Sequence, residues 1–408
     1  MRGVSKIGAI AGLLVLTSLA DAEAQQKSIK IGMTLPFTGA DAENAAQIKN
    51  GAMMAIDEAN AKEGFAGHKI DVVMYDTGTV TTGQYDPAQA ATTARMLVAD
   101  QEVVANIGPQ MSGEGKAMTP ILSEADLATI TPSSTNPDIT NPAMAAQFKP
   151  EGRTIYFRTV TTDAYQGPFM ANYLLRQLKV KTVFVLDDSG AYGIGIADSF
   201  QKQAETIGLK VLGRDQLVPK DADYSAVLTR IKALKPDALY YGGAALAGVK
   251  LAKQSHDIVP DMIKAGGDGM GGASVAAGVG FPAIEGWYYT SASPHMTGEK
   301  AAKDWVKSYE DKYKSQPSDY SITAYDAALV VLDAIKRVAQ SRKEINRTTV
   351  RQAIQEANVE TMQGVVSFDA NGDINDRTVS VFQFSKNPNF PDDDYVHQHK
   401  YLGPAPQS

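Results

Sequence analysis

Two neighbouring apolar segments, each running into small polar residues, constrain the fold of this chain most strongly. Residues Val103–Ile107 form a short apolar run that ends at Gly108-Pro109, and Ser112 follows where a helix is expected to begin. Residues 127–130 form a second apolar run, and further hydroxyl residues follow it directly. Runs of this kind, separated by a helix, are typical of parallel strands in a sheet that is covered on both faces.

The ends of these two strands predict a ligand site. In open α/β sheets, ligands bind beyond the carboxyl ends of the strands. The first N–H groups of a helix lack intrahelical partners, so hydroxyl-rich loops at a helix start favour an anion. Small polar residues at strand ends are also common turn formers, and ordinary caps and turns are the alternative. We interpret the two loops as a carboxylate site, with these candidate residues: Ser112, Thr131, Ser133, Ser134 and Thr135.

Alternating strands and helices continue along most of the chain. The first series has strands at 28–35, 69–75, 103–107 and 127–130, with helices at 43–63, 87–100 and after Ser112. A second series has strands at 155–159, 182–186, 211–212 and 238–241, with helices at 165–178, 194–207, 224–234 and 247–255. Such alternation is the pattern of a doubly wound parallel sheet. Two series of similar size predict two α/β units, each with its own sheet.

The last quarter of the chain departs from this pattern. It has a strand at 285–290 and helices at 299–313, 322–339 and 350–356. Two further apolar runs, 365–368 and 379–384, are predicted to pair as a hairpin around residues 369–373. That turn weakly resembles a calcium loop, but its glycine is misplaced and no glutamate occupies the twelfth position. A plain Asn-Gly turn is therefore preferred.

Composition and motifs exclude several functional classes. The 408 residues carry a net charge of −7 with no basic block, which argues against nucleic acid as a partner. There is no cysteine, which excludes disulfides and thiolate chemistry. No zinc-protease spacing, nucleophile elbow or P-loop motif occurs. His397 and His399 are interpreted as part of a solvated tail, and Asp187 and Asp188 as strand-end caps. We therefore expect no enzyme, no metal and no cofactor.

The first residues are typical of a secretory signal. Arg2 and Lys6 precede a short apolar run at 7–19, and Ala22-Glu23-Ala24 fits a cleavage site before Gln25. The run is shorter than the roughly 20 residues that span a bilayer. A non-cleaved anchor is the alternative. We expect residues 1–24 to be removed and the mature protein to be soluble outside the cytoplasm.

Several motifs together resemble a known family. They are LPFTG at 35–39, TPSSTNPDIT at 131–140, YQGP at 165–168, YYGG at 240–243, GDG at 267–269 and FDANGD at 368–373. In this combination the chain resembles the branched-chain amino-acid-binding family of periplasmic substrate-binding proteins, the receptors of ABC importers. The resemblance covers essentially all of the mature chain.

The resemblance implies two doubly wound α/β lobes joined by a three-segment hinge, with the ligand between the lobes. It places the N-terminal lobe at 25–158 and 291–364, and the C-terminal lobe at 159–290 and 365–408. The crossovers are expected near 158–161, 286–291 and 362–366. It further implies a periplasmic receptor that delivers a small carboxylate to an ABC permease, and we expect a monomer.

The resemblance also assigns roles to the charged and hydroxyl residues. Ser112 matches the family's serine that holds the ligand carboxylate. Ser133 and Thr135, with Ser134 between them, match a second loop that binds the carboxylate and amino group. Asp268 falls where the family usually has an acid that pairs with the ligand ammonium.

Four further positions shape the expected pocket. Tyr192 falls on an aromatic position that packs on the ligand, and Tyr320 near a wall position. Asn44 and Ala244 stand where close relatives often have tyrosines. The loss of two rings should enlarge or reshape the pocket, so the ligand can be bulkier than leucine.

Two ligand classes stay open. An apolar amino acid would pair its ammonium with Asp268, whereas a benzoate-type acid could stack on Tyr192 in the room left by Asn44 and Ala244. The amino acid is preferred because an ion pair satisfies a buried carboxylate. A ligand-sensing domain for a signalling partner shares the same fold, which therefore cannot distinguish it.

Overall fold

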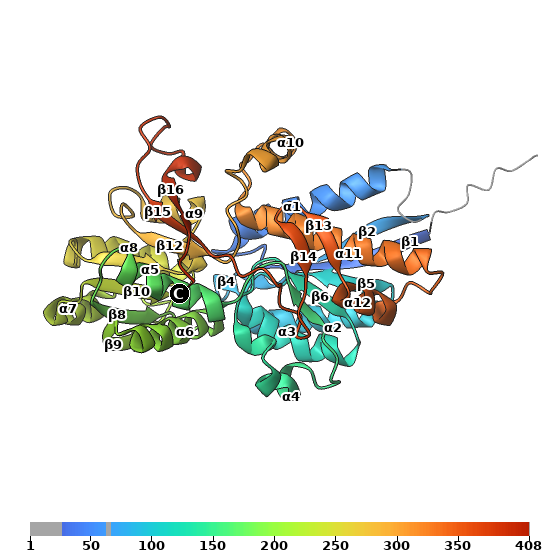
Figure 1. The fold of residues 1–408 in the computed structure, drawn as a ribbon, viewed down its shortest axis with the longest axis horizontal. Coiled ribbons are helices and arrows are strands. Elements are labelled where there is room, and N and C mark those ends of the chain that lie inside the picture. Colours follow the sequence, from blue (N-terminus) through green and yellow to red (C-terminus); the bar gives the residue numbers. More distant parts are fainter. Residues whose placement is uncertain (1–26, 63–66, 408) are drawn as a thin grey trace, which may run out of the picture.

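Two β-sheets, one in each half of the molecule, organise the structure (Figure 1). The computed structural model describes residues 27–62 and 67–407. The expected signal peptide at 1–24 lies outside them. The first sheet has five parallel strands in the order β2-β1-β5-β6-β7. These strands are β1 (Lys27–Leu35), β2 (His68–Asp76), β5 (Val103–Ile107), β6 (Ala128–Thr131) and β7 (Tyr156–Arg158).

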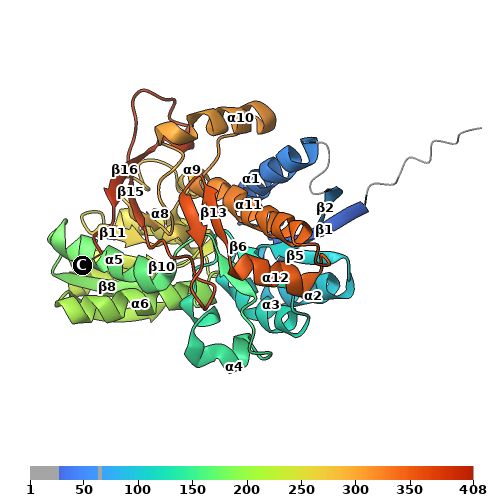
Figure 2. The same ribbon diagram turned by 45° about the vertical axis from the view of Figure 1, so that its right-hand side comes forward.

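Helices cover both faces of the first sheet (Figure 2). On one face, α1 (Ala42–Ala61) lies beside α11 (Asp319–Gln340), with α12 (Arg347–Gln355) next to α11. On the other face are α2 (Pro87–Ala99) and α3 (Ser112–Glu124). The helices α1 and α11 are far apart in sequence but share one apolar core that includes Ile48, Ile56 and Val331. The first half is thus completed by the last quarter of the chain.

The second sheet has seven strands in the order β16-β15-β12-β11-β10-β8-β9. The strands from β12 to β9 are parallel, namely β8 (Thr182–Asp187), β9 (Lys210–Gln216), β10 (Ala238–Gly242), β11 (Ile263–Gly266) and β12 (Tyr288–Ser291). The edge strands β15 (Ser380–Phe384) and β16 (His399–Pro404) run antiparallel. Val183 and Val185 face one core while Phe184 and Leu186 face the other, as expected for strands buried on both faces.

The helices of the second half also lie on two faces. On one face are α5 (Asp163–Arg176) and α6 (Ala191–Ile207). On the other are α7 (Ser225–Leu234), α8 (Ala245–Ile258) and α9 (Ala273–Val279). Smaller elements complete the fold: β3 (Gly78–Thr79), β4 (Gln84–Tyr85), α4 (Ala145–Phe148) and α10 (Lys303–Tyr313). The predicted architecture of two α/β units is confirmed.

The predicted hairpin between residues 365–368 and 379–384 is wrong. The strand β14 (Gly364–Ser367) pairs with β13 (Asn358–Thr361), whereas β15 pairs with β12 and β16. The turn itself folds back, with a bridge between Phe368 and Ile374. Phe368 and Ile374 then pack into the core of the first half, while Phe382 packs into that of the second. Burial in two different cores separates the two runs.

The chain passes between the halves three times. The connections follow β7, β12 and Ile374, and they lie close together: Thr161 N–H donates to Ala292 O at 2.8 Å, and Ser380 Oγ to Ser293 O at 2.8 Å. The third crossing follows the turn at 369–373 and does not lie at 362–366. We propose that the first lobe extends to residue 374, while the other lobe boundaries stay as predicted.

Candidate functional site

A small cavity lies between the two halves, where the strands of both sheets end. Its volume is about 50 Å³. The first half contributes Asp41, Asn44, Ile48, Gln110, Met111, Ser112, Ser133 and Tyr320, and the second half contributes Tyr192, Ala244, Ala245, Asp268 and Gly269. The predicted residues Ser134 and Thr135 do not line it. Gln110 was not predicted, although it precedes Ser112 in the same loop.

Ser112 is the first residue of α3, as predicted. Its Oγ accepts the N–H of Asn136 at 3.2 Å and the hydroxyl of Ser134 at 3.5 Å. Because both bonds use the oxygen, the Ser112 proton remains available to a ligand in the cavity. The first-turn N–H groups of α3 add a positive partial charge beside it.

Glu114 would oppose an anion in this position if it were ionised. The side chain is fully buried in the first turn of α3, where it accepts the N–H of Met111 at 2.8 Å and the hydroxyl of Thr77. Burial raises the pKa of Glu114 to about 8. The start of α3 therefore carries no full negative charge at neutral pH, which suits a carboxylate ligand.

The second polar loop is held by the protein itself. Ser133 Oγ donates to Gln110 O at 3.0 Å, and Ser134 Oγ accepts the hydroxyl of Tyr156 at 2.8 Å. The N–H groups of Ser133 and Ser134 donate to Thr131 Oγ1. The loop carries Ser133 into the cavity, whereas Ser134 supports Ser112 from behind.

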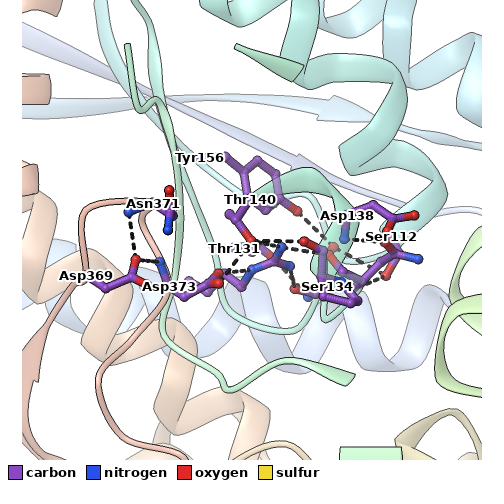
Figure 3. Close-up of polar contacts among 12 residues, drawn as sticks. Ser112, Thr131, Ser134, Asp138, Thr140, Tyr156, Asp369, Asn371 and Asp373 are labelled. Atoms are coloured by element: carbon purple, nitrogen blue, oxygen red, sulfur yellow. Dashed lines mark hydrogen bonds and ion pairs between the residues drawn. The ribbon is translucent and has the colours of Figure 1, made fainter. Parts of the chain in front are cut away.

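A buried arginine, Arg158, holds this loop in place. Figure 3 labels three of the residues that it contacts, Ser134, Thr140 and Asp373. Arg158 has no exposed side-chain surface. Its Nη1 donates to Ser134 O at 2.6 Å and its Nη2 to Asn136 O at 2.7 Å, while Nε pairs with Asp373 at 2.7 Å. Thr140 bonds to both Arg158 and Asp373. The guanidinium thus joins the second polar loop to the turn at 369–373.

The same contacts settle how that turn is built. Asp369 Oδ1 accepts the N–H groups of Asn371 at 2.8 Å and Asp373 at 3.0 Å. The carboxylate of Asp373 accepts hydrogen bonds from Arg158 and Thr140. A calcium ion would have to compete with a guanidinium for that carboxylate. These contacts favour a plain turn, and the absence of a calcium site stays a prediction.

The acid predicted for the second half, Asp268, lies in the glycine-rich loop after β11. Its carboxylate accepts the hydroxyls of Tyr192 and Tyr320 and, at 3.1 Å, the Nε2 of Gln166. Tyr320 belongs to α11 of the first half, so this bond joins the two halves across the cavity. The next residue, Gly269, must be a glycine, because a Cβ there would lie 2.3 Å from the carbonyl oxygen of Gly243. Three neutral donors therefore satisfy Asp268.

A second buried acid, Asp163, was not predicted. Gln166 Nε2 donates to Asp163 at 3.0 Å as well as to Asp268, and thereby links the two carboxylates. Burial, and then the charge of Asp268, raise the pKa of Asp163, while the hydroxyl of Thr135 lowers it. Burial also raises the pKa of Asp268. A cationic group near this pair would therefore be stabilised.

Other candidate residues have structural roles. Asp187 pairs with Arg214 at 2.8 Å, and Asp188 accepts the N–H groups of Gly190 and Ala244, which confirms them as caps and partners. The interpretation of His399 as part of a solvated tail is wrong, because it belongs to β16 and bonds to Tyr289 at 3.0 Å.

Neither a metal cluster nor a membrane span is found in the part of the chain that the structure describes. Residues 27–62 and 67–407 hold no group of three or more His, Cys, Asp or Glu that could bind a metal ion. Within the same ranges, no helix combines the length and apolar character needed to cross a bilayer.

Comparison with known proteins gives the family. The model of the periplasmic binding protein family matches residues 28–389. A Leu/Ile/Val-binding protein of Rhizobium johnstonii is 31% identical over 91% of this chain and 95% of its own length. The chain belongs to the periplasmic binding protein family.

Two solved structures show the same fold. A leucine binding protein, LivK, of Thermotoga maritima superposes with a TM-score of 0.78 at 25% identity, over 92% of this chain and 98% of its own. The branched-chain amino acid transporter substrate binding protein LivJ of Streptococcus pneumoniae, in complex with isoleucine, has a TM-score of 0.77 at 25% identity, over 93% and 100%.

The brace of Arg158 makes a first prediction. Asp373→Asn should lower the free energy of unfolding by about 1.5–3 kcal/mol, because it removes a charged hydrogen-bond partner from a buried guanidinium. Asp138→Asn is the matched control, since Asp138 lies on the braced loop but is 44% exposed and pairs with Lys116. The control should cost about 0–1 kcal/mol. Urea denaturation measures both, and equal effects would contradict the brace.

Proposed function

We propose that this protein is an extracytoplasmic receptor that binds an apolar amino acid between its lobes and delivers it to an ABC permease. The observation that carries the proposal is the pairing, in one cavity, of an anion site from the first half with a buried acid from the second. We further propose that residues 1–24 are removed on export to the periplasm. The protein acts there as a monomeric binding protein and not as an enzyme.

The proposed binding mode uses both ends of the cavity. The ligand carboxylate accepts the free hydroxyl proton of Ser112 and N–H groups at the start of α3. The ligand ammonium replaces one of the neutral donors on Asp268, because a charge-assisted hydrogen bond is stronger than a neutral one. The Leu/Ile/Val-binding relative and the isoleucine complex of LivJ support an apolar amino acid.

An aromatic carboxylate is the second candidate, and one observation favours it. Tyr192, Tyr320 and Gln166 already satisfy Asp268, so a ligand without an ammonium does not leave that acid unpaired. The ring would then lie near Asn44 and Ala244. A signalling role for the same ligand-binding fold is equally compatible with this site.

Leucine and 4-methylpentanoate, which lacks only the amino group, test whether the ligand needs an ammonium. Leucine should bind the wild type and 4-methylpentanoate should not. Asp268→Asn should weaken leucine about 10- to 150-fold, because a hydrogen bond to a charged group is lost. Isothermal titration calorimetry measures each affinity, with Asp138→Asn as a control that should change nothing. If both ligands bind equally, or Asp268→Asn is neutral, the ammonium role of Asp268 is rejected.

The proposed carboxylate site predicts that removal of the Ser112 hydroxyl and of the Thr135 hydroxyl will affect ligand binding differently. Ser112→Ala removes a donor that faces the cavity and should weaken leucine binding about 10- to 150-fold. Thr135→Ala removes a buried hydroxyl that does not line the cavity and should change leucine binding much less. Calorimetry and thermal unfolding on both variants test this. The reverse pattern would place the carboxylate at the second loop.

The buried acids predict how affinity changes with pH. The ammonium favours ionised Asp268, and burial raises the pKa of Asp268 in the free protein, so affinity should rise with pH over the range in which Asp268 loses its proton. Above pH 8, Glu114 ionises beside the carboxylate and affinity should fall again. For a carboxylate without an ammonium, affinity should not rise. Titrations in buffers of different ionisation enthalpy detect the released proton directly.

A further inference from the structure

A second, larger cavity adjoins the first. It measures about 340 Å³, and we call it the outer chamber and the smaller one the inner chamber. Asn44, Asp268 and Tyr320 line both and form the junction between them. The far walls of the outer chamber come from the loop before α9, from β12 and the connection after it, and from β15 and β16.

The two volumes divide a ligand into two parts. A cavity needs about 10–15 Å³ of such space for each water molecule that it holds, so an inner chamber of about 50 Å³ has room for roughly three to five waters. That is enough for a carboxylate and an ammonium but not for all the non-hydrogen atoms of a leucine. The outer chamber falls within the roughly 300–1,000 Å³ typical of ligand sites. Because Asp268 lies at the junction, an amino acid bound to it can direct its side chain into the outer chamber.

Aromatic rings form the apolar wall of the outer chamber. Tyr289 and Phe382 stack with their centroids 5.1 Å apart. His399 lies 5.4 Å from the Phe382 ring, and His295 meets the same ring edge-on at 5.1 Å. Gly271 packs against the Tyr289 ring, where a Cβ would lie 2.8 Å from a ring carbon, whereas a Cβ on Gly272 would meet only Asn44, at 3.7 Å. A flat ring can extend such a cluster, because aromatic pairs add to the energy of apolar burial.

The lining of the outer chamber has few charged groups that could pair with a charged side chain of a ligand. No Lys or Arg is among the described residues that line it. Its acid Asp319 is already occupied by His295 at 2.9 Å and by the N–H groups of Met296 and Thr297. Burial lowers the pKa of His399 to about 4, so this ring is neutral at neutral pH. The wall therefore suits an uncharged side chain, and a ring in particular.

We propose that the preferred ligand is an aromatic α-amino acid, with its head group in the inner chamber and its ring in the outer chamber. The inference rests on the proposed function and makes it more specific. Asn44 supports it, because its side chain takes less room at the junction between the chambers than a tyrosine would.

The ranking of ligands on the wild type is the first test. By calorimetry, L-phenylalanine should bind about tenfold or more tightly than L-leucine, since only the ring reaches the wall of Tyr289 and Phe382. Leucine binding as tightly as phenylalanine, or more tightly, overturns the inference but leaves the proposed function intact. If neither amino acid binds, the proposed function itself fails.

Filling the outer chamber is the second test. Ala273→Phe should weaken L-phenylalanine about tenfold more than it weakens L-alanine, which needs only the inner chamber. Ala277→Phe is the matched control, because Ala277 is exposed on the same helix α9 and does not line the chamber. Asn44→Tyr, which narrows the junction, should give the same selectivity if Ala273→Phe does not fold. Equal losses for both ligands would overturn the inference.

Discussion

The site depends on one buried charge, the guanidinium of Arg158. A cation without solvent is tolerated only when its donors are satisfied, and here the carbonyls of Ser134 and Asn136 and the carboxylate of Asp373 do so. These partners lie on two segments, the second polar loop and the turn at 369–373, and Arg158 itself ends β7. The hydrogen bonds of Arg158 can therefore all form only when the second polar loop takes one position relative to the connections between the halves.

On the other side of that loop the buried charges are acids, and their pKa values are raised. Glu114 is neutral at neutral pH and therefore does not repel an anion at the start of α3. Asp163 and Asp268 share one amide donor, the side chain of Gln166. Burial thus works against a full negative charge on each of these acids. A zwitterion brings its own opposite charges to the two ends, so the protein need not bury a full charge before the ligand arrives.

Local signals predicted much of this structure, and distant contacts account for what they missed. The strand Val103–Ile107 and the start of α3 at Ser112 follow from an apolar run and a turn, which depend on neighbouring residues. The hairpin failed because β15 pairs with β12, almost a hundred residues earlier. Asp163 and Gln166 were missed for the same reason, since they meet Asp268 only in the folded chain. For His399, the alternation with Tyr401 in the last strand was an available signal.

The contacts between the halves show where specificity can arise. Tyr320 of the first half donates to Asp268 of the second, and Asn136 Nδ2 donates to Ala191 O at 2.7 Å across the same gap. The halves can therefore close on their own hydrogen bonds. Under the proposed binding mode, a ligand exchanges donors at Asp268 instead of filling an unsatisfied site. Such an exchange favours a ligand only by the difference between its own contacts and those it displaces. Selectivity then falls to the side chain, because the head-group exchange is the same for every α-amino acid.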